Sequence, residues 1–152
     1  MCSYCGCEAE PVISLLMDDH ATVTSLIGDA EGRLNAGDVA RAFEVAADIQ
    51  VIFGRHSRME ERGLFAQLQA AGEATEEVAT LVVEHRKITA GLSAAAGVRD
   101  GAMLKRVLGF LMAHAQTEDN DLFPFALQRL PNENWGLVEE VHQAMLTRGA
   151  MA

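Results

Sequence analysis

Two histidine and glutamate pairs with the same spacing are the residues of this chain best suited to chemistry. His56 lies four residues before Glu60, and His114 lies four residues before Glu118. On an α-helix, positions four apart differ by only about 40° around the axis, so each pair presents its imidazole and carboxylate side by side. Imidazole and carboxylate together suit iron, manganese or zinc. Each pair therefore predicts part of a metal site.

The sequences around the two pairs repeat one another. From His56 the chain reads HSRMEERGLF, and from His114 it reads HAQTEDNDLF. The histidine, the glutamate, a following acidic residue and a Leu-Phe step recur in the same register. One predicted helix earlier, each repeat is preceded by an acidic residue and a histidine, Asp19-His20 and Glu84-His85. We interpret the chain as two halves, each consisting of a pair of helices.

Four histidines at such positions favour a metal site, although one alone would usually be a hydrogen-bonded core residue. The residue one turn before each histidine is apolar, which predicts side chains that point inward; these residues are Leu16, Ile52, Leu81 and Phe110. Burying four imidazoles and two carboxylates without a cation would cost much free energy. Two carboxylates can bridge two ions while two histidines cap each, so two ions fit better than one. The candidate ligands are His20, His56, Glu60, His85, His114 and Glu118.

Five helices must position these side chains. The apolar spacing predicts helices over residues 11–31, 38–70, 75–96, 100–130 and 135–146. Pro11 suits a first helical turn, Asp38 is a predicted N-cap, and Pro124 predicts a kink or break within the fourth helix. The short connections favour an all-α fold, an antiparallel up-down-up-down four-helix bundle with the short fifth helix packed alongside.

Length and charge restrict the function further. The chain has 152 residues, which predicts one domain, residues 11–148, after a cysteine-rich tail of residues 1–10. Its net charge of −10 argues against binding to nucleic acid or to anionic membrane surfaces. No apolar run reaches the roughly 18 residues of a membrane span, and the first residues do not resemble a secretory signal. We expect a cytoplasmic location.

Two further features could carry chemistry. Cys2, Cys5 and Cys7 suit redox exchange or the binding of a soft metal, but three thiols are one short of a four-thiolate zinc site, and a mobile tail is the simpler interpretation. His142 completes one ExxH motif with Glu139, whereas ferritin-like di-iron bundles need two. We therefore expect His142 to be structural or exposed.

The ordered set of ligands resembles the signature of the hemerythrin-like (HHE cation-binding) family, which is H, HxxxE, H, HxxxE on four helices. The Leu-Phe-Pro step that follows the last glutamate of the family is intact at residues 122–124 and partial at residues 64–66. The resemblance covers roughly residues 12–130.

This resemblance implies a non-heme di-iron centre, two iron ions with an oxo or hydroxo bridge. It also implies that Glu60 and Glu118 bridge the two irons. His20 and His56 would then serve one iron, and the remaining two histidines, His85 and His114, the other.

The chain departs from oxygen-carrying hemerythrins at one position. Those carriers have a fifth histidine four residues before the one on the third helix, and here that residue is Leu81. One iron is then expected to have an open site, which favours reactions in which a substrate binds the metal directly. Groups that could fill the position instead are solvent, Tyr4, Glu61, Glu84 and His142.

The open site implies a redox enzyme that acts on hydrogen peroxide, in the manner of a catalase or peroxidase, or on nitric oxide. The di-iron centre itself would be the catalytic group, and the sequence identifies no separate acid or base. The alternative is a protein that binds or senses dioxygen or nitric oxide, or binds iron, without turnover. The expected partners are small diatomic molecules or peroxide, and a redox partner protein is a further candidate that the acidic charge allows.

Overall fold

The computed structural model describes residues 10–151, and this part of the chain is almost entirely helical and contains no strand. Two helices are simple, α1 (Pro11–Asn35) and α4 (Thr75–Val98). Two others run on through a π-helical turn into a further segment. These are α2 (Val39–Glu60), η2 (Glu61–Phe65) and α3 (Ala66–Ala70), then α5 (Gly101–Thr117), η3 (Glu118–Leu122) and α6 (Phe123–Arg129). The last helix is α7 (Asn132–Met151).

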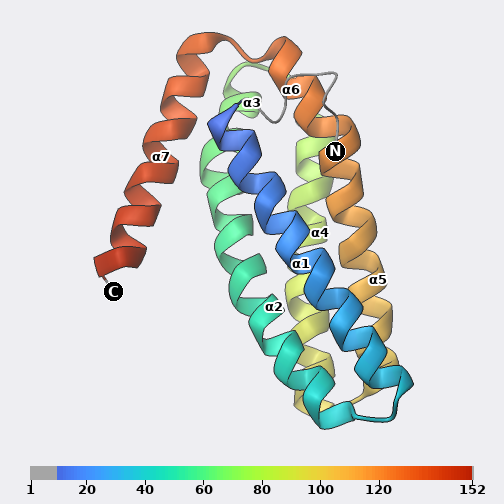
Figure 1. Cartoon of the computed structure of the whole chain (residues 1–152). Coiled ribbons are helices and arrows are strands. Elements are labelled where there is room, and N and C mark those ends of the chain that lie inside the picture. The colour runs from blue at the N-terminus through green and yellow to red at the C-terminus, as the bar shows by residue number, and fades with distance from the viewer. Residues whose placement is uncertain (1–9, 152) are drawn as a thin grey trace.

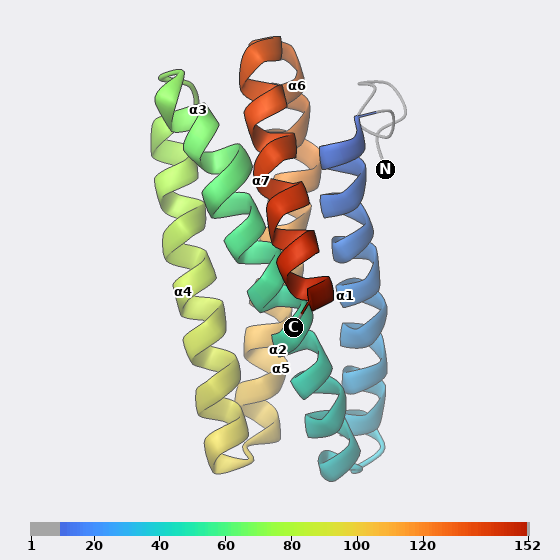
Figure 2. The same ribbon diagram turned by 90° about the vertical axis from the view of Figure 1, so that its left-hand side faces the viewer.

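The four long helices pack side by side, and successive helices are joined at alternate ends of the molecule (Figures 1 and 2). α1 packs mainly on α2, and α4 packs mainly on α5. After α6 the chain turns back, and α7 runs along the outside of the bundle, where it contacts η2, α3, α1 and α2 (Figure 2). The prediction of an all-α helical bundle is confirmed. No helix of the described part is both long and apolar enough to cross a membrane.

The helix starts follow from local chemistry. Pro11 stands at the start of α1, where a missing N–H costs nothing. The carboxylate of Asp38 accepts a hydrogen bond from the backbone N–H of Arg41 at 3.2 Å, as the sequence predicts for an N-cap. Asp100 caps α5 in the same way, with the N–H groups of Ala102 and Met103 as donors. These caps satisfy donors that would otherwise lack a partner.

The helix does not break at Pro124, one of the two outcomes predicted there, but continues through this residue. Pro124 lies in the first turn of α6, directly after the π turn η3. There the N–H of Phe123 donates to the carbonyl of Glu118, five residues back, instead of four. A π turn already interrupts the usual hydrogen-bond ladder at this point, so the chain can place a residue without an N–H beside it.

The last helix is longer than predicted. It begins at Asn132, directly after Pro131, and extends to Met151, whereas the apolar pattern indicated residues 135–146. Trp135 and Val138 anchor this helix on the bundle, since both side chains are buried. The amide of Asn134 also donates to the side-chain oxygen of Gln67 at 2.8 Å.

The core consists of two hydrophobic clusters, one towards each end of the bundle. The first surrounds Ile13, Phe65 and Phe123, and the second surrounds Ile49 and Leu108. Buried polar side chains form a layer between them: His20, His56, Glu60, His85, His114 and Glu118. One of the residues expected to lie on a core-facing stripe, Phe110, is instead 39 % exposed. Even so, the histidine one turn later, His114, is buried.

Candidate metal centre

The structure brings all six predicted site residues into the buried polar layer. Glu60 and Glu118 are fully buried, at 0 % exposure, and the four histidines are nearly so. Each glutamate is the last residue before its π turn or the first residue within it. A π turn widens the helix locally and often accompanies a functional site. The sequence predicts the helical pairs but contains no signal for these two turns.

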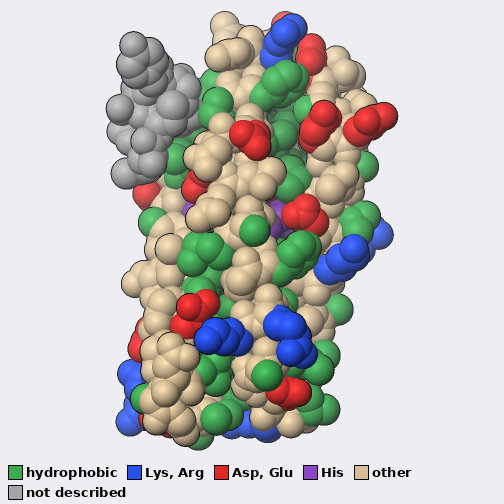
Figure 3. Space-filling model, turned by 90° about the vertical axis from the view of Figure 1, so that its right-hand side faces the viewer, with side chains coloured by type: hydrophobic (Ala, Val, Ile, Leu, Met, Phe, Trp, Pro, Cys, Tyr) green, Lys and Arg blue, Asp and Glu red, His purple; other side chains and the backbone are tan. Residues whose placement is uncertain are grey.

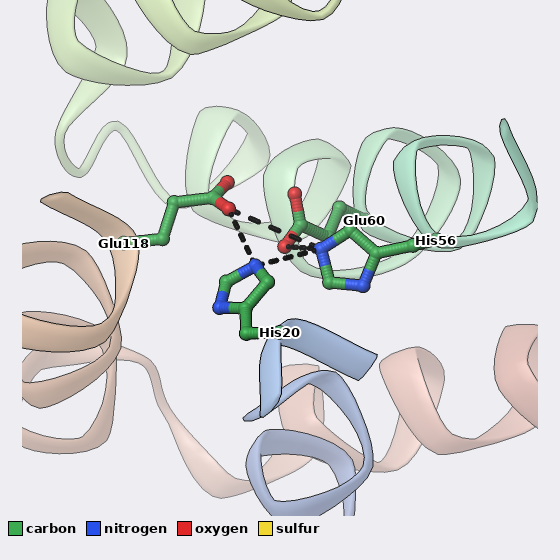
Figure 4. Close-up of side chains that lie close together, drawn as sticks. All are labelled: His20, His56, Glu60 and Glu118. Atoms are coloured by element: carbon green, nitrogen blue, oxygen red, sulfur yellow. Dashed lines mark hydrogen bonds and ion pairs between the residues drawn. The ribbon is translucent and has the colours of Figure 1, made fainter. Parts of the chain in front are cut away.

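The side chains form two overlapping groups that share both glutamates. One consists of His20, His56, Glu60 and Glu118, and in the other His85 and His114 replace the first two histidines. Within each group the possible ligand atoms all lie within 4.8 Å of one another. Figure 4 shows the first group, in which side chains from α1, α2 and η3 point toward a common centre.

The histidines direct their Nε2 atoms at the two carboxylates. In the first group, Nε2 of His56 lies 2.7 Å from Oε1 of Glu60, and Nε2 of His20 lies 3.1 Å from Oε1 of Glu118. In the second group, Nε2 of His85 lies 3.2 Å from Oε2 of Glu60, and Nε2 of His114 lies 3.3 Å from Oε1 of Glu118. Each glutamate thus lies close to two histidines. One is four residues earlier in the same continuous helical segment, and the other comes from a different helix.

The inward-facing atoms fit metal ions better than they fit one another. All four oxygens of Glu60 and Glu118 are buried without a hydrogen-bond partner, and so are the Nε2 atoms of His85 and His114. Buried polar atoms without partners are rare and costly in native proteins. Lone pairs of nitrogen and oxygen that converge from four helices would be satisfied by cations. The six residues therefore form a candidate metal centre with room for more than one ion.

The opposite ring nitrogen, Nδ1, faces a second carboxylate in every case. The Nδ1–H of His20 can donate to Asp119 at 2.7 Å and that of His56 to Asp19 at 3.2 Å. The same contacts recur in the other half, from His114 to Glu84 at 3.3 Å and, more loosely, from His85 to Glu61 at 3.6 Å. A carboxylate behind a metal-binding histidine fixes its tautomer and orientation and makes it a better ligand.

The four outer carboxylates follow the internal repeat. Asp19 and Glu84 each precede the first histidine of their half. Each contacts the second histidine of that half, His56 or His114, and not the histidine next to it in the sequence. The acid after each glutamate crosses to the other half, so Glu61 faces His85 and Asp119 faces His20. In the sequence, these acids are recognisable only as members of the repeat, without an assigned supporting role. The signal was present, since the repeat contains both acids in both halves.

The repeated Leu-Phe step also has a function in the structure. The ring of Phe65 stacks on His85 at 5.5 Å, with 9° between the planes. In the other half, the ring of Phe123 stacks on His20 at 5.7 Å and 13°. Each phenylalanine therefore holds one imidazole from the neighbouring half in a fixed plane.

The charges in the polar layer strongly shift the pKa values of His20, His56 and Glu118. Burial alone would lower the pKa of His20, but Asp119 and the nearby Glu118 raise it to about 9. Burial also opposes protonation of His56, yet the charge of Glu60 and the bond to Asp19 hold its pKa well above the ordinary value. For Glu118, burial would raise the pKa, but the adjacent His114 and His20 lower it well below its usual range. Without a metal, these shifts favour protonated His20 and His56 beside an ionised Glu118.

These shifts predict how stability depends on pH when no metal is bound. The pKa of His20 is about 9 in the fold and about 6.5 when unfolded, so its contribution is complete below about pH 6.5 and is lost as the pH rises through about 9. The lowered pKa of Glu118 acts in the opposite direction, and its contribution is lost only in acid. Thermal unfolding of metal-free protein should therefore give a higher Tm near pH 6 than near pH 9. An equal or higher Tm near pH 9 would contradict this assignment.

Replacing Asp19 by asparagine should weaken metal binding without removing a ligand. Asp19 is buried, and its second oxygen accepts a 2.7 Å bond from Arg55. Asparagine keeps the size but loses the charge that orients His56, a change that typically costs about 10- to 100-fold in affinity. Competition with a chelator would measure the loss. The exposed neighbour Asp18 provides the matched control, Asp18→Asn, and equal affinities in the two variants would refute the role of Asp19.

None of the groups considered as replacements for the missing fifth histidine belongs to the ligand cluster in the described part of the chain. Glu61 and Glu84 lie behind histidines, as described, and His142 is buried against η2, outside both groups. Tyr4 and the three cysteines, Cys2, Cys5 and Cys7, lie outside the described residues. Leu81 is buried, one turn before His85.

A groove opens beside Leu81, on the face formed by α4, α5, η3 and α6. Its volume is about 610 Å³, and its walls include Thr80, Glu84, Thr117, Leu122 and Phe125. Figure 3 shows this face, on which most acidic side chains lie in the upper half and most basic ones in the lower half.

Comparison with known proteins agrees with this geometry. The family model described as hemerythrin HHE cation binding domain matches residues 12–126, a range that contains all six residues of the cluster. No curated protein matches the chain, and no solved structure matches it. The family model covers about three quarters of the sequence, from the start of α1 into α6. The chain therefore belongs to the hemerythrin HHE cation-binding domain family.

Proposed function

We propose that this chain is a di-iron redox enzyme that consumes hydrogen peroxide, built on the antiparallel up-down-up-down bundle of its family. His20 and His56 would hold one iron, and His85 and His114 would hold the other. Glu60 and Glu118 would bridge the two, because each glutamate belongs to both groups of possible ligand atoms. The donor set of imidazole and carboxylate suits iron, and iron rather than manganese or zinc follows from the family.

One observation carries the choice of an enzyme over an oxygen carrier. The position at which oxygen-carrying hemerythrins have a fifth histidine holds Leu81, whose side chain is 3 % exposed and cannot bind a metal. With four histidines and two shared carboxylates, the centre has fewer protein ligands than those carriers. An open position favours direct reaction of a substrate with the metal.

Peroxide is the favoured substrate because its disproportionation is self-contained. Two molecules of hydrogen peroxide give one dioxygen and two water molecules, so one peroxide is oxidised, the other is reduced, and no further electron donor is consumed. A bound iron pair supplies the two-electron redox chemistry for this exchange. Reduction of nitric oxide would instead require a separate donor, such as a redox partner protein.

The chain's own residues would orient the ligands and handle protons. Glu84 contacts Nδ1 of His114 and lines the groove, so it lies between the centre and water. It is placed to exchange protons with solvent as peroxide loses them and water gains them. Asp19 holds His56 from a more enclosed position, whereas Asp119, behind His20, is 28 % exposed.

The test is sustained peroxide loss by iron-loaded protein, followed by the release of dioxygen. The proposal expects about one dioxygen for every two peroxides, at a rate proportional to the iron content. Without turnover, a spectrum that changes reversibly with dioxygen or nitric oxide would replace the enzyme by a binding protein. Peroxide loss that persists after the iron is removed would also overturn the proposal.

A further inference from the structure

We infer that small neutral molecules reach the metal centre through the groove between α4 and the α5–η3–α6 segment, and that carboxylates around its mouth exclude small anions. This inference rests on the proposed function, since it names the route and the charge of the substrate for the same site.

The floor of the groove borders on the ligand cluster. Leu81 lies one turn before His85, and Leu122 lies one turn after Glu118; both side chains are buried and line the groove. Glu84, on its wall, contacts His114 directly. Two apolar side chains and one carboxylate thus separate the groove from the centre.

The internal repeat predicts an equivalent groove in the first half, but α7 packs against it and narrows it. On α1, the positions that correspond to Glu76, Glu77 and Thr80 are Pro11, Val12 and Leu15, counted back from the equivalent histidines. Instead of lining a wide groove, these three residues line a smaller pocket of about 200 Å³, whose opposite wall is formed by side chains of α7, namely Glu139, His142, Gln143 and Leu146.

A glycine makes this close packing possible. Gly63 lies three residues after Glu60, at the position that Asp121 occupies after Glu118. A Cβ atom at Gly63 would lie 3.2 Å from the ring of His142 and 3.3 Å from Val138, so a larger residue would push α7 outward. In the second half, Asp121 is exposed, and no helix of the described chain covers the groove there. Of the two equivalent approaches to the centre, α7 therefore narrows one and leaves the other wide.

The open groove carries negative charge. Four of its lining residues are acidic, Glu76, Glu77, Glu84 and Asp121, and none of the lining residues in the described chain is basic. Most basic side chains on this face lie in its lower half, away from the groove (Figure 3). An exception is Arg129, whose guanidinium lies 5.9 Å from the ring centre of Phe125 at the edge of the groove. A cleft lined by charge of one sign concentrates the field and repels small ions of the same sign. Hydrogen peroxide and nitric oxide are neutral and meet no such barrier.

The route is tested by filling the groove. Thr80 is exposed on its wall, and Thr80→Trp should slow the binding of both azide and nitric oxide to iron-loaded protein in stopped-flow absorbance by about tenfold or more, because the indole occupies the path. Thr89→Trp places the same side chain at an exposed position two to three turns further along α4 and should leave both rates unchanged. Equal rates in the two variants would overturn the route.

The exclusion of anions is tested by replacing the exposed acidic residues at the entrance of the groove with neutral ones. The triple variant Glu76→Gln, Glu77→Gln, Asp121→Asn should bind azide about tenfold faster than wild type at low salt, while nitric oxide binds at the wild-type rate. High salt should abolish most of the difference. The control removes three exposed acids elsewhere, with Glu44→Gln, Asp48→Asn and Glu140→Gln, and so changes the net charge equally.

The outcomes separate this inference from the proposed function. A control variant that accelerates azide as much as the mouth variant would show a general charge effect and would overturn the exclusion of anions. If all variants change the binding rates of azide and nitric oxide as predicted but the protein consumes no peroxide, the enzyme is refuted and the route is supported. Protein that binds no iron in any preparation would overturn both.

Discussion

Glu118→Ala should lower the iron content from about two ions per chain to nearly none. Glu118 belongs to both ligand groups, lies between His20 and His114, and is fully buried, so its removal takes a carboxylate from both ion positions at once. His20→Ala should behave differently, because His20 belongs to the first group alone. That variant should retain about one ion. Elemental analysis of freshly purified and anaerobically reconstituted protein would measure both contents.

The neighbouring Asp121 provides the control for this experiment. Asp121→Ala removes an exposed carboxylate from the same π turn and should leave the iron content at the wild-type value. Circular dichroism would show whether each variant remains helical. Full iron content in Glu118→Ala would refute the shared carboxylate, and equal losses in Glu118→Ala and His20→Ala would refute two separate positions. Wild-type protein without iron would remove the basis of the enzyme.

Leu81→His should convert an open centre into a more fully ligated one. The new imidazole would stand one turn before His85, on the same face of α4 and at the floor of the groove. If it binds the nearer iron, the peroxide would lose its position, and the rate of peroxide loss should fall by about tenfold or more while the iron content stays near two. Azide affinity, followed by absorbance, should fall in parallel.

The control for this variant keeps the shape of the side chain without adding a ligand. Leu81→Ile conserves the volume at a buried site and should retain most of the activity. Peroxide loss at the wild-type rate in Leu81→His, with iron bound, would show that the position near Leu81 is not where the reaction occurs. Equal loss of activity in both variants would indicate a packing effect instead.

Much of the ligand set could be predicted from the sequence because helical periodicity is a local property. A spacing of four residues places His56 beside Glu60 in any α-helix, and the repeat shows that the arrangement occurs twice. The apolar neighbour one turn away was a weaker guide. Phe110 is partly exposed although His114 is buried, since residues four apart still differ in direction around the axis.

The remaining features depend on contacts between helices. The pairing of Asp119 with His20 joins residues 99 positions apart, and the rotation of each helix decides it. The two π turns have no known composition signal, so the sequence assigns the irregularity of this helix to Pro124 instead of to the residues just before it. The narrowing of one groove by α7 depends on how that helix docks on Gly63, and an apolar helix face alone does not identify the surface that it covers.

The polar layer that divides the core has a consequence for cooperativity. The two hydrophobic clusters on either side of it are joined through the six buried polar side chains, and apolar packing across this plane is correspondingly small. Bound ions would bond helices from both halves at this plane and so tie the two clusters into one folding unit. In their absence, the ends of the bundle can open with different free energies, as separate cooperative units do in native proteins. The metal would then couple the unfolding of the two ends of the bundle, in addition to forming the reactive centre.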